Sequence, residues 1–259
     1  MRTTAKILIC ALILGALCAF AGCTNGAEDG KLLDFEINAD GESYCVMGIG
    51  KFSGSRLVIP DEYEGLPVTS IYTCAFENCS SITEIVIPES VTYIGMGAFT
   101  GCTSLVEIKI PNGVDILPHG LFAGCTSLTK VTLPERVSAV EQSVFSGCSS
   151  LISVVLPEGM SAIPAQMFKD CTSLKSLVVP EGVEKIQVFS LLGCTSLERI
   201  VIPSSVMLIE HQAMARCSSL VSIEYKGTAD EWSAMQKRQS WNLGTGGYTV
   251  HCTDGDVEE

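Results

Sequence analysis

The stretch that decides the fold is CTSLVEIKIPNGVDILPHGLFAG, from Cys102 to Gly124. The same pattern recurs on both sides of it, and its cysteines follow one another at intervals of 23 residues, at Cys79, Cys102, Cys125, Cys148, Cys171, Cys194 and Cys217. Six prolines keep the same interval, at Pro88, Pro111, Pro134, Pro157, Pro180 and Pro203. A fixed period of about 20–29 residues is typical of a solenoid, in which each repeat is one supersecondary unit stacked on the next.

Within each unit, the apolar residues predict one short strand. Ile108 and Ile110 are period-2 neighbours that point inward, and Lys109 between them points outward. Pro111 then ends the strand because it has no N–H to donate to a ladder. We therefore predict short parallel strands on a concave sheet, at residues 57–59, 85–87, 108–110, 131–133, 154–156, 177–179, 200–202 and 223–225.

The repeated string C-x-S-L-x-x-I-x-I-P-x-x-V-x-x-I-x-x-x-x-F-x-x resembles the BspA-type leucine-rich repeat, which occurs in a family of bacterial surface proteins. The resemblance covers residues from about Phe35 to Asp256, and about nine positions of the string recur in register across six consecutive units. The resemblance implies a leucine-rich-repeat solenoid over residues 57–225. It also implies binding of host matrix or other cell-surface proteins through the repeat surface.

One unit near the C-terminal end departs from this pattern. Leu191 stands where the other units have Phe, and Phe189 lies two residues earlier in the chain. Met214 takes the same position in the following unit. We expect looser packing there, because the repeated aromatic side chain is lost.

The ends of a solenoid need caps, since a terminal turn would otherwise expose its core. Residues 35–56 alternate in polarity around a turn, which predicts an N-terminal β-hairpin cap. Residues 226–259 predict a C-terminal helix and strand cap with an acidic tail. Its helix begins at a capping box formed by Thr228 and Glu231, and the two tryptophans that follow are expected to plug the core.

The N-terminal segment has the composition of an export signal. An uncharged run over residues 7–22 follows two basic residues and is short for a bilayer span, so residues 1–22 are predicted to be a signal peptide. The run ends in FAGC, Phe20–Cys23, which resembles the bacterial lipoprotein box except that Phe stands where Leu is usual. Residues 23–34 would then form a lipidated Cys23 and a flexible tether, at the cell envelope or surface. A plain secretory signal and an uncleaved anchor helix are the alternatives.

The charge balance and the motif content disfavour two broad classes of function. Lys and Arg number 16 against 29 Asp and Glu, a net charge of −13, whereas a nucleic-acid-binding protein needs clustered basic residues. The sequence carries no nucleophile elbow, metalloprotease helix, P-loop or EF-hand loop, and its three histidines lie in different units. We therefore expect no enzyme, no catalytic residue, no cofactor and no metal site.

The cysteine column allows a second interpretation, because seven thiols in one line could bind metal or form disulfides. A linear column cannot place four sulfurs tetrahedrally around one ion. In-register parallel side chains also point the same way rather than toward one another. We therefore expect Cys79, Cys102, Cys125, Cys148, Cys171, Cys194 and Cys217 to be buried free thiols that fill a structural ladder.

The outward strand positions offer a candidate binding surface. Val155, Val178 and Val201 would form an apolar stripe on a face that should meet solvent, flanked by Lys130 and Arg199. Val is also simply a good strand former, so the stripe is a hypothesis. It predicts a protein partner for a chain that is otherwise expected to be a monomer.

Three classes of function stay open at this point. The leading one is a lipid-anchored cell-surface protein that binds other proteins, on host or neighbouring cells. An envelope scaffold or glycan-binding module within its own cell is the alternative, although no outward strand position in either column is aromatic, which disfavours sugar stacking. An enzyme is the least favoured.

Overall fold

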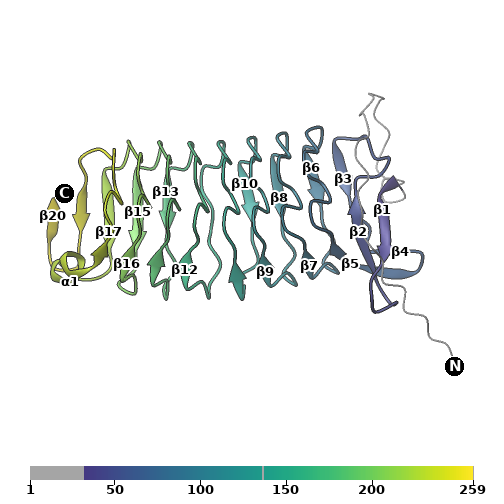
Figure 1. The fold of residues 1–259 in the computed structure, drawn as a ribbon, viewed down its shortest axis with the longest axis horizontal. Helices are drawn as coiled ribbons and strands as arrows, with labels where there is room; N and C mark the ends of the chain where they lie inside the picture. The colour runs from purple at the N-terminus through teal and green to yellow at the C-terminus, as the bar shows by residue number, and fades with distance from the viewer. Residues whose placement is uncertain (1–31, 136, 259) are drawn as a thin grey trace.

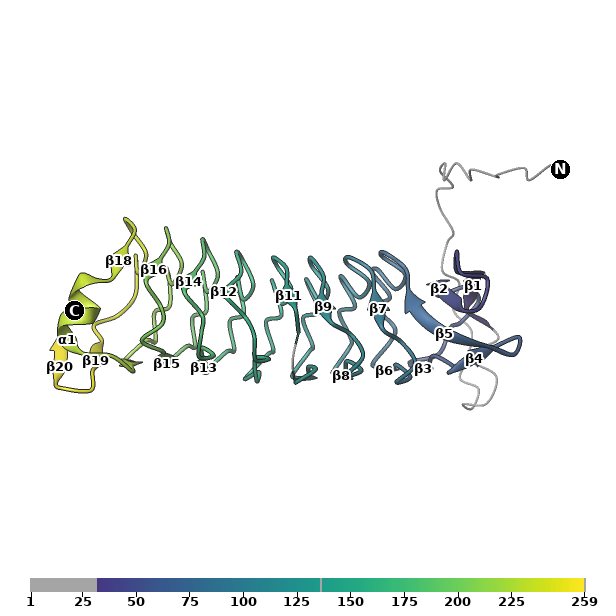
Figure 2. The ribbon, with the colours of Figure 1, turned by 90° about the horizontal axis from the view of Figure 1, so that it is seen from below.

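The computed structural model describes residues 32–135 and 137–258, which form an elongated rod of stacked turns (Figures 1 and 2). Most turns contribute one strand to each of two sheet-bearing sides and a tight turn to a third side. Identical repeat positions therefore lie next to one another along the rod. The predicted signal peptide and Cys23 lie outside the described residues.

The first sheet consists of the short strands that come a few residues after the cysteines in sequence. These strands are parallel, and strands of adjacent turns pair with one another. Val131 lies opposite Ile108, and Leu177 lies opposite Ile200, so the inward residues of neighbouring turns pack directly on one another. Most strands begin and end about one residue earlier than predicted, because the proline after the last inward residue cannot extend the ladder. The strands are β3 (Arg56–Val58), β6 (Glu84–Val86), β8 (Glu107–Lys109), β10 (Lys130–Thr132), β13 (Ser176–Val178), β15 (Arg199–Ile202) and β17 (Ser222–Tyr225).

The strand predicted at residues 154–156 is absent, and this prediction is wrong. The first sheet consequently has two parts, one with the order β10-β8-β6-β3 and one that starts at β13. The apolar pattern of this turn survives, since Leu151 and Leu156 are buried. What is missing is ladder pairing of residues 153–155 with β10 and with β13, although the Glu158 N–H still donates to the Glu135 carbonyl of the preceding turn at 3.0 Å. Pairing depends on how the two turns are spaced, which a pattern within one turn does not encode.

A second sheet, not predicted from the sequence, lies along the opposite edge of the rod (Figure 2). Most of its strands are two residues long, too short for a period-2 pattern to be recognised. The strands are β5 (Leu66–Ile71), β7 (Tyr93–Ile94), β9 (Ile116–Leu117), β11 (Ala139–Val140), β12 (Ala162–Ile163), β14 (Lys185–Ile186), β16 (Leu208–Ile209) and β18 (Gln236–Lys237).

Two prolines coincide with the interruptions of this second sheet. β7 pairs with β5 and β9 pairs with β11, but no ladder joins β7 to β9 or β11 to β12. Pro118 directly follows β9, and Pro164 directly follows β12. The residue at this repeat position otherwise donates its N–H to the preceding turn, as Glu141 does to the carbonyl of Leu117. Proline has no N–H to donate, so the ladder opens at these two places.

The third side is held by a column of buried phenylalanines. Neighbouring rings are nearly parallel, with centroids 5.6–5.8 Å apart, from Phe76 through Phe99, Phe122 and Phe145 to Phe168. Leu191 and Met214 continue the column and are fully buried. The expected looser packing is therefore wrong at the level of burial, because these flexible apolar side chains fill the same space.

Short elements lie at both ends of the rod. β1 (Asp34–Ile37) and β2 (Tyr44–Gly48) form an antiparallel pair within the region predicted as a hairpin, and β4 (Glu62–Tyr63) pairs with β5. At the other end, α1 (Ala229–Ala234) precedes β19 (Thr249–His251) and β20 (Asp256–Glu258). None of the helical segments in the described part of the chain has the length and apolarity that a membrane crossing needs.

Side-chain contacts at the C-terminal end match the sequence prediction. The predicted capping box is present: the Glu231 N–H donates to Thr228 Oγ1 at 3.2 Å, and the Thr228 N–H donates to the Glu231 carboxylate at 2.8 Å. Trp232 and Trp241 are buried, with ring centroids 6.1 Å apart. Both tryptophans are therefore core residues, as predicted.

Candidate functional site

The predicted valine stripe lies on the outer face of the first sheet. Val178 on β13 is directly opposite Val201 on β15. Val155 precedes them by one turn but belongs to no strand. The exposed fraction is 86% for Val155 and 62% for Val178, whereas Val201 is half-buried. Two large apolar side chains in successive turns thus meet solvent, which costs free energy unless a partner covers them.

The two cations predicted to flank the stripe lie in different surroundings. The Arg199 guanidinium pairs with Glu224, which also pairs with Lys226. The Lys226 ammonium and the Arg199 guanidinium lower the pKa of the Glu224 carboxyl to about 2. Lys130 is exposed on β10, across the sheet interruption from the valines. The structure therefore brings Arg199 to the valines as part of an ion network and leaves Lys130 in the other part of the sheet.

The cysteine column lies inside the core. From Cys102 to Cys217, six of its side chains are fully buried, whereas Cys79 is half-buried at the end of the column. Each of the six donates its S–H to the main-chain carbonyl 26 residues earlier, as Cys148 does to Phe122 at 3.1 Å. Burial raises the pKa of the Cys125 and Cys171 thiols to about 12. The geometry is that of a small apolar filler with one satisfied donor.

The described residues offer little to metal or nucleophilic chemistry. Within residues 32–135 and 137–258, no group of three or more His, Cys, Asp or Glu side chains could hold a metal ion. The His211 ring lies 2.7 Å from the Gln239 carbonyl, and the His251 ring lies 3.0 Å from Asp256. Both contacts are exposed, so neither ring sits in the dry, convergent site that catalysis needs.

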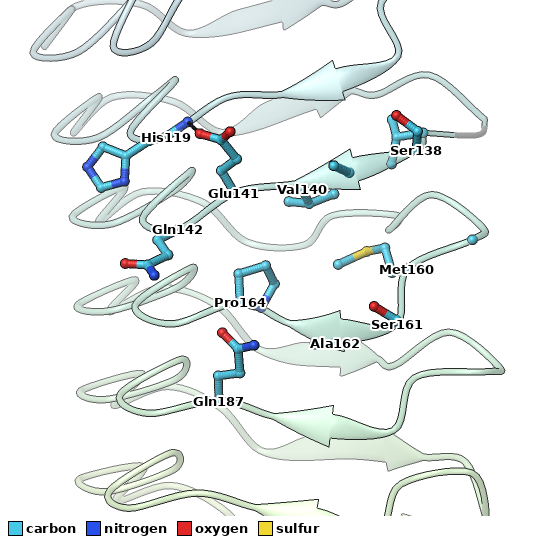
Figure 3. Close-up of a pocket in the computed structure, with 13 residues that line it drawn as sticks. His119, Ser138, Val140, Glu141, Gln142, Met160, Ser161, Ala162, Pro164 and Gln187 are labelled. Atoms are coloured by element: carbon cyan, nitrogen blue, oxygen red, sulfur yellow. Dashed lines mark hydrogen bonds between the residues drawn. The ribbon is translucent and has the colours of Figure 1, made fainter.

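Sequence reasoning missed a cavity of about 590 Å³ on the second sheet. It lies between β11 and β12, where the ladder is interrupted, and both strands and their flanking residues line it (Figure 3). The signal that could have found it is Pro164, which stands at a position that donates an N–H in neighbouring turns. We call this cavity the β11–β12 cleft.

Polar side chains at the rim of the cleft already form hydrogen bonds with the adjacent turn on their own side of the cleft. The His119 N–H donates to Glu141 Oε2 at 2.7 Å, and the Ala165 N–H donates to Gln187 Oε1 at 3.0 Å. Ser138 donates its Oγ–H to the Asp115 carboxylate at 2.8 Å. These bonds hold the rim in place on both sides of the cleft.

Comparison with known proteins places this arrangement in a class. The parallel solenoid, with one 23-residue unit per turn, is that of the leucine-rich-repeat proteins. The family model named BspA type leucine rich repeat region (6 copies) matches residues 69–188 and 161–235 of this chain. The chain belongs to this family. No sequence match was found among curated proteins.

Several solved structures share the fold. A leucine-rich repeat protein of T. pallidum is 26% identical, with a TM-score of 0.54, and the match covers 74% of this chain and 79% of that one. One from Bacteroides ovatus is 23% identical, with a TM-score of 0.61, covering 82% and 67%. One from Eubacterium ventriosum is 28% identical, with a TM-score of 0.59, covering 68% and 46%.

Family membership gives a coarse functional statement. BspA-type repeat proteins are typically bacterial surface proteins, and their repeats form scaffolds for protein interaction rather than catalytic centres. The chain is thus a repeat scaffold of the protein-interaction type.

Proposed function

We propose that the chain is a lipid-anchored cell-surface protein that binds a partner protein through the outer face of the first sheet. The observation that carries the proposal is the exposure of Val155 and Val178 in successive turns, next to Val201. A soluble repeat surface gains nothing from such residues unless they are covered. The family and the lipoprotein box at Cys23 support the location.

In each strand the inward side chains form the core and the outward side chains meet solvent. The outward surface can therefore vary from one protein to another. Leu177 and Ile200 are fully buried and fix the register of β13 and β15. The outward positions between and beside them can change without disturbing the core. One scaffold can therefore present different partner-specific surfaces.

Replacing Val155, Val178 and Val201 together by Thr tests the proposal. Thr is nearly the same size and also favours strands, so folding stability should change little. Because interface energy is concentrated in a few desolvated contacts, affinity for a protein partner should fall by about 1 kcal/mol or more. Binding is measured on arrays of purified extracellular-matrix and cell-surface proteins, and then by titration against each protein retained.

A matched control replaces Val106 and Val221 by Thr. Both are exposed valines that lie outside the stripe, so this variant should bind like the wild type. Equal binding by the wild type and a folded triple variant would place the partner site elsewhere on the molecule.

A further inference from the structure

The turn that begins at Cys125 and the turn that begins at Cys148 form no ladder with each other in either sheet, although the Glu158 N–H donates to the Glu135 carbonyl at 3.0 Å between the two sheets. The first sheet is interrupted between β10 and β13, and the second sheet between β11 and β12. On the third side the two turns stay in contact, since the Phe145 and Phe168 rings stack 5.6 Å apart as elsewhere in the column. The junction is thus closed at the phenylalanines and at the Glu158–Glu135 bond, and its ladder is open in each of the two sheets.

The main chain at the cleft lacks a bond that the neighbouring junctions make. In the preceding junction the Glu141 N–H donates to the Leu117 carbonyl at 2.9 Å, and in the following one the Gln187 N–H donates to the Ile163 carbonyl at 3.0 Å. The equivalent residue at the cleft is Pro164, which has no N–H. The acceptor it would have used is the carbonyl at the end of β11.

A second bond is also missing at this junction. By register, the Ser161 N–H corresponds to the donor that Ser138 uses toward the turn before it, and it would bond to the Ser138 carbonyl. Within residues 32–135 and 137–258, this bond is not formed. The Ser161 N–H and the carbonyls of Ser138 and Val140 are therefore available to a bound molecule. Unpaired strand edges of this kind are templates for another extended chain.

The side chains around the cleft are mainly small or flexible. Val140 is half-buried, whereas Leu117 and Ile163 at the equivalent positions are fully buried, so the cleft exposes part of the core. Met160 and Pro164 add apolar surface on the β12 side (Figure 3). Methionine adapts its shape to different neighbours, which suits a site that accepts more than one side chain.

The cleft carries negative charge. Among the described lining residues Glu141 is the only Asp, Glu, Lys or Arg. One of its carboxylate oxygens accepts the His119 N–H, and within the described residues the other has no partner. The chain as a whole has a net charge of −13. Charge complementarity therefore favours a cationic ligand.

We propose that the β11–β12 cleft binds an extended peptide that adds as a strand at the open edges of β11 and β12 and places a Lys or Arg side chain on Glu141. An extended peptide offers N–H and C=O groups on both edges at strand spacing, which matches what the two strands leave unpaired. A globular ligand of the same charge would leave those groups unpaired. This site is separate from the valine stripe and is additional to the proposed function.

Synthetic ten-residue peptides with alternating Val and Thr test the site. One carries a central Lys, the second carries Glu at that position, and the third is the Lys peptide N-methylated at alternate residues. Binding to the full-length chain is followed by fluorescence anisotropy. Main-chain pairing gives affinity with little demand on sequence, so the Lys peptide should bind, the Glu peptide more weakly, and the N-methylated peptide not at all.

Variants of the chain test the two parts of the proposal. Glu141→Gln should lower affinity for the Lys peptide about threefold, the size of an exposed ion pair, and remove the preference over the Glu peptide. Pro164→Gln should close the ladder, since Gln187 at the equivalent position donates its N–H to Ile163 and accepts the Ala165 N–H, both in the preceding turn. It should lower affinity about tenfold or more, because two main-chain bonds to the peptide are lost.

Pro118→Gln is the matched control, because it closes the other interrupted junction of the second sheet. It should leave peptide binding unchanged, and circular dichroism and thermal melting check that each variant is folded. Equal binding of the Lys peptide by a folded Pro164→Gln variant overturns the proposal, as does no binding of any peptide by the wild type.

Two further outcomes separate this proposal from its competitors. Sedimentation showing that the wild type dimerises and Pro164→Gln does not would assign the cleft to a second copy of the chain instead. Since Pro164→Gln retains all three stripe valines, it should still bind whatever partner the first-sheet face retains. Failure of the peptide site therefore leaves the proposed function standing, and failure of the stripe leaves the peptide site standing.

Discussion

Each cysteine in the buried column combines a small side chain with a hydrogen-bond donor. It is small enough to fit where successive turns are about one strand spacing apart, and its S–H satisfies a main-chain carbonyl inside the core. Cys148, for instance, has no exposed surface and donates to the Phe122 carbonyl. A larger apolar residue would lose this S–H bond, although the Phe122 carbonyl would still accept the Cys125 N–H, so the cost is that of one weak hydrogen bond, about 1 kcal/mol or less.

The buried thiols predict a loss of stability at alkaline pH. Their folded pKa, about 12 for Cys125 and Cys171, exceeds the ordinary value of 9.0, because burial disfavours the thiolate. The stabilisation is therefore complete below pH 9 and is lost as the pH rises toward 12, since the unfolded chain ionises first. Urea unfolding under reductant at about pH 8 and about pH 10.5 should show this decrease.

The double variant Cys125→Ala/Cys171→Ala is the comparison for this prediction. It should be less stable than the wild type at pH 8, because two buried side chains are shortened, but the difference should narrow at higher pH because the variant lacks two of the ionising thiols. A constant difference across this range would contradict the assigned cause.

Among the elements, α1 depends on its surroundings more than on its own length. A helix of six residues is far below the length at which isolated helices are stable. The capping box satisfies two main-chain N–H groups at its start, and Trp232 packs against Tyr225 with ring centroids 5.4 Å apart. The helix therefore forms because the end of the rod holds it.

Thr228→Ala should destabilise this end of the rod by about 1 kcal/mol, the usual cost of losing an N-cap side chain. Thr228→Asp should restore most of that loss, because its carboxylate accepts the same N–H. Tryptophan fluorescence during urea unfolding reports on the region through Trp232 and Trp241. Equal midpoints for the Ala and Asp variants would show that the cap bond is unimportant.

The strands show which features a repeated sequence encodes. The spacing of cysteines and prolines predicts the first-sheet strands and their register, since each inward residue must meet its equivalent in the next turn. Residues 153–155 fit that pattern as well as Ser176–Val178 does, yet only the latter form a strand. Pairing is a property of two turns together, so the interruption was not predictable from either turn alone.

The two candidate sites, the valine stripe and the β11–β12 cleft, also differ in whether the sequence alone predicts them. The valine stripe follows from the outward positions of a repeated strand and was predictable residue by residue. The β11–β12 cleft results from a missing N–H at Pro164 and from partly exposed Val140 on the facing strand. Only the three-dimensional alignment of the turns shows that these two residues face one opening.

At the scale of the whole molecule, the proposed function depends on how the chain is attached to the cell membrane as well as on its binding face. A rod with a net charge of −13 gains no electrostatic attraction to an acidic membrane surface. Stable attachment would then need hydrophobic anchors, and a lipidated Cys23 would carry more than one acyl chain. The sequence FAGC at residues 20–23 is what points to that modification.

Cys23→Ser tests the anchor directly. Metabolic labelling with a fatty acid should mark the wild type and leave the variant unlabelled, and the variant should appear in the culture medium. Comparable release of both proteins into the medium would show that Cys23 does not retain the chain at the cell.

Equal spacing of the cysteines has a genetic consequence. Because the side chains of each turn meet their equivalents in the next, losing or duplicating one 23-residue unit by recombination between repeats rejoins matching surfaces. Such events among the units from Cys171 onward would change the length of the rod and, where Val178 or Val201 is lost or duplicated, the valine stripe. An event that removes the unit carrying Pro164 would also remove the opening in the second sheet. Related strains are therefore expected to vary in repeat number while both ends of the rod stay the same.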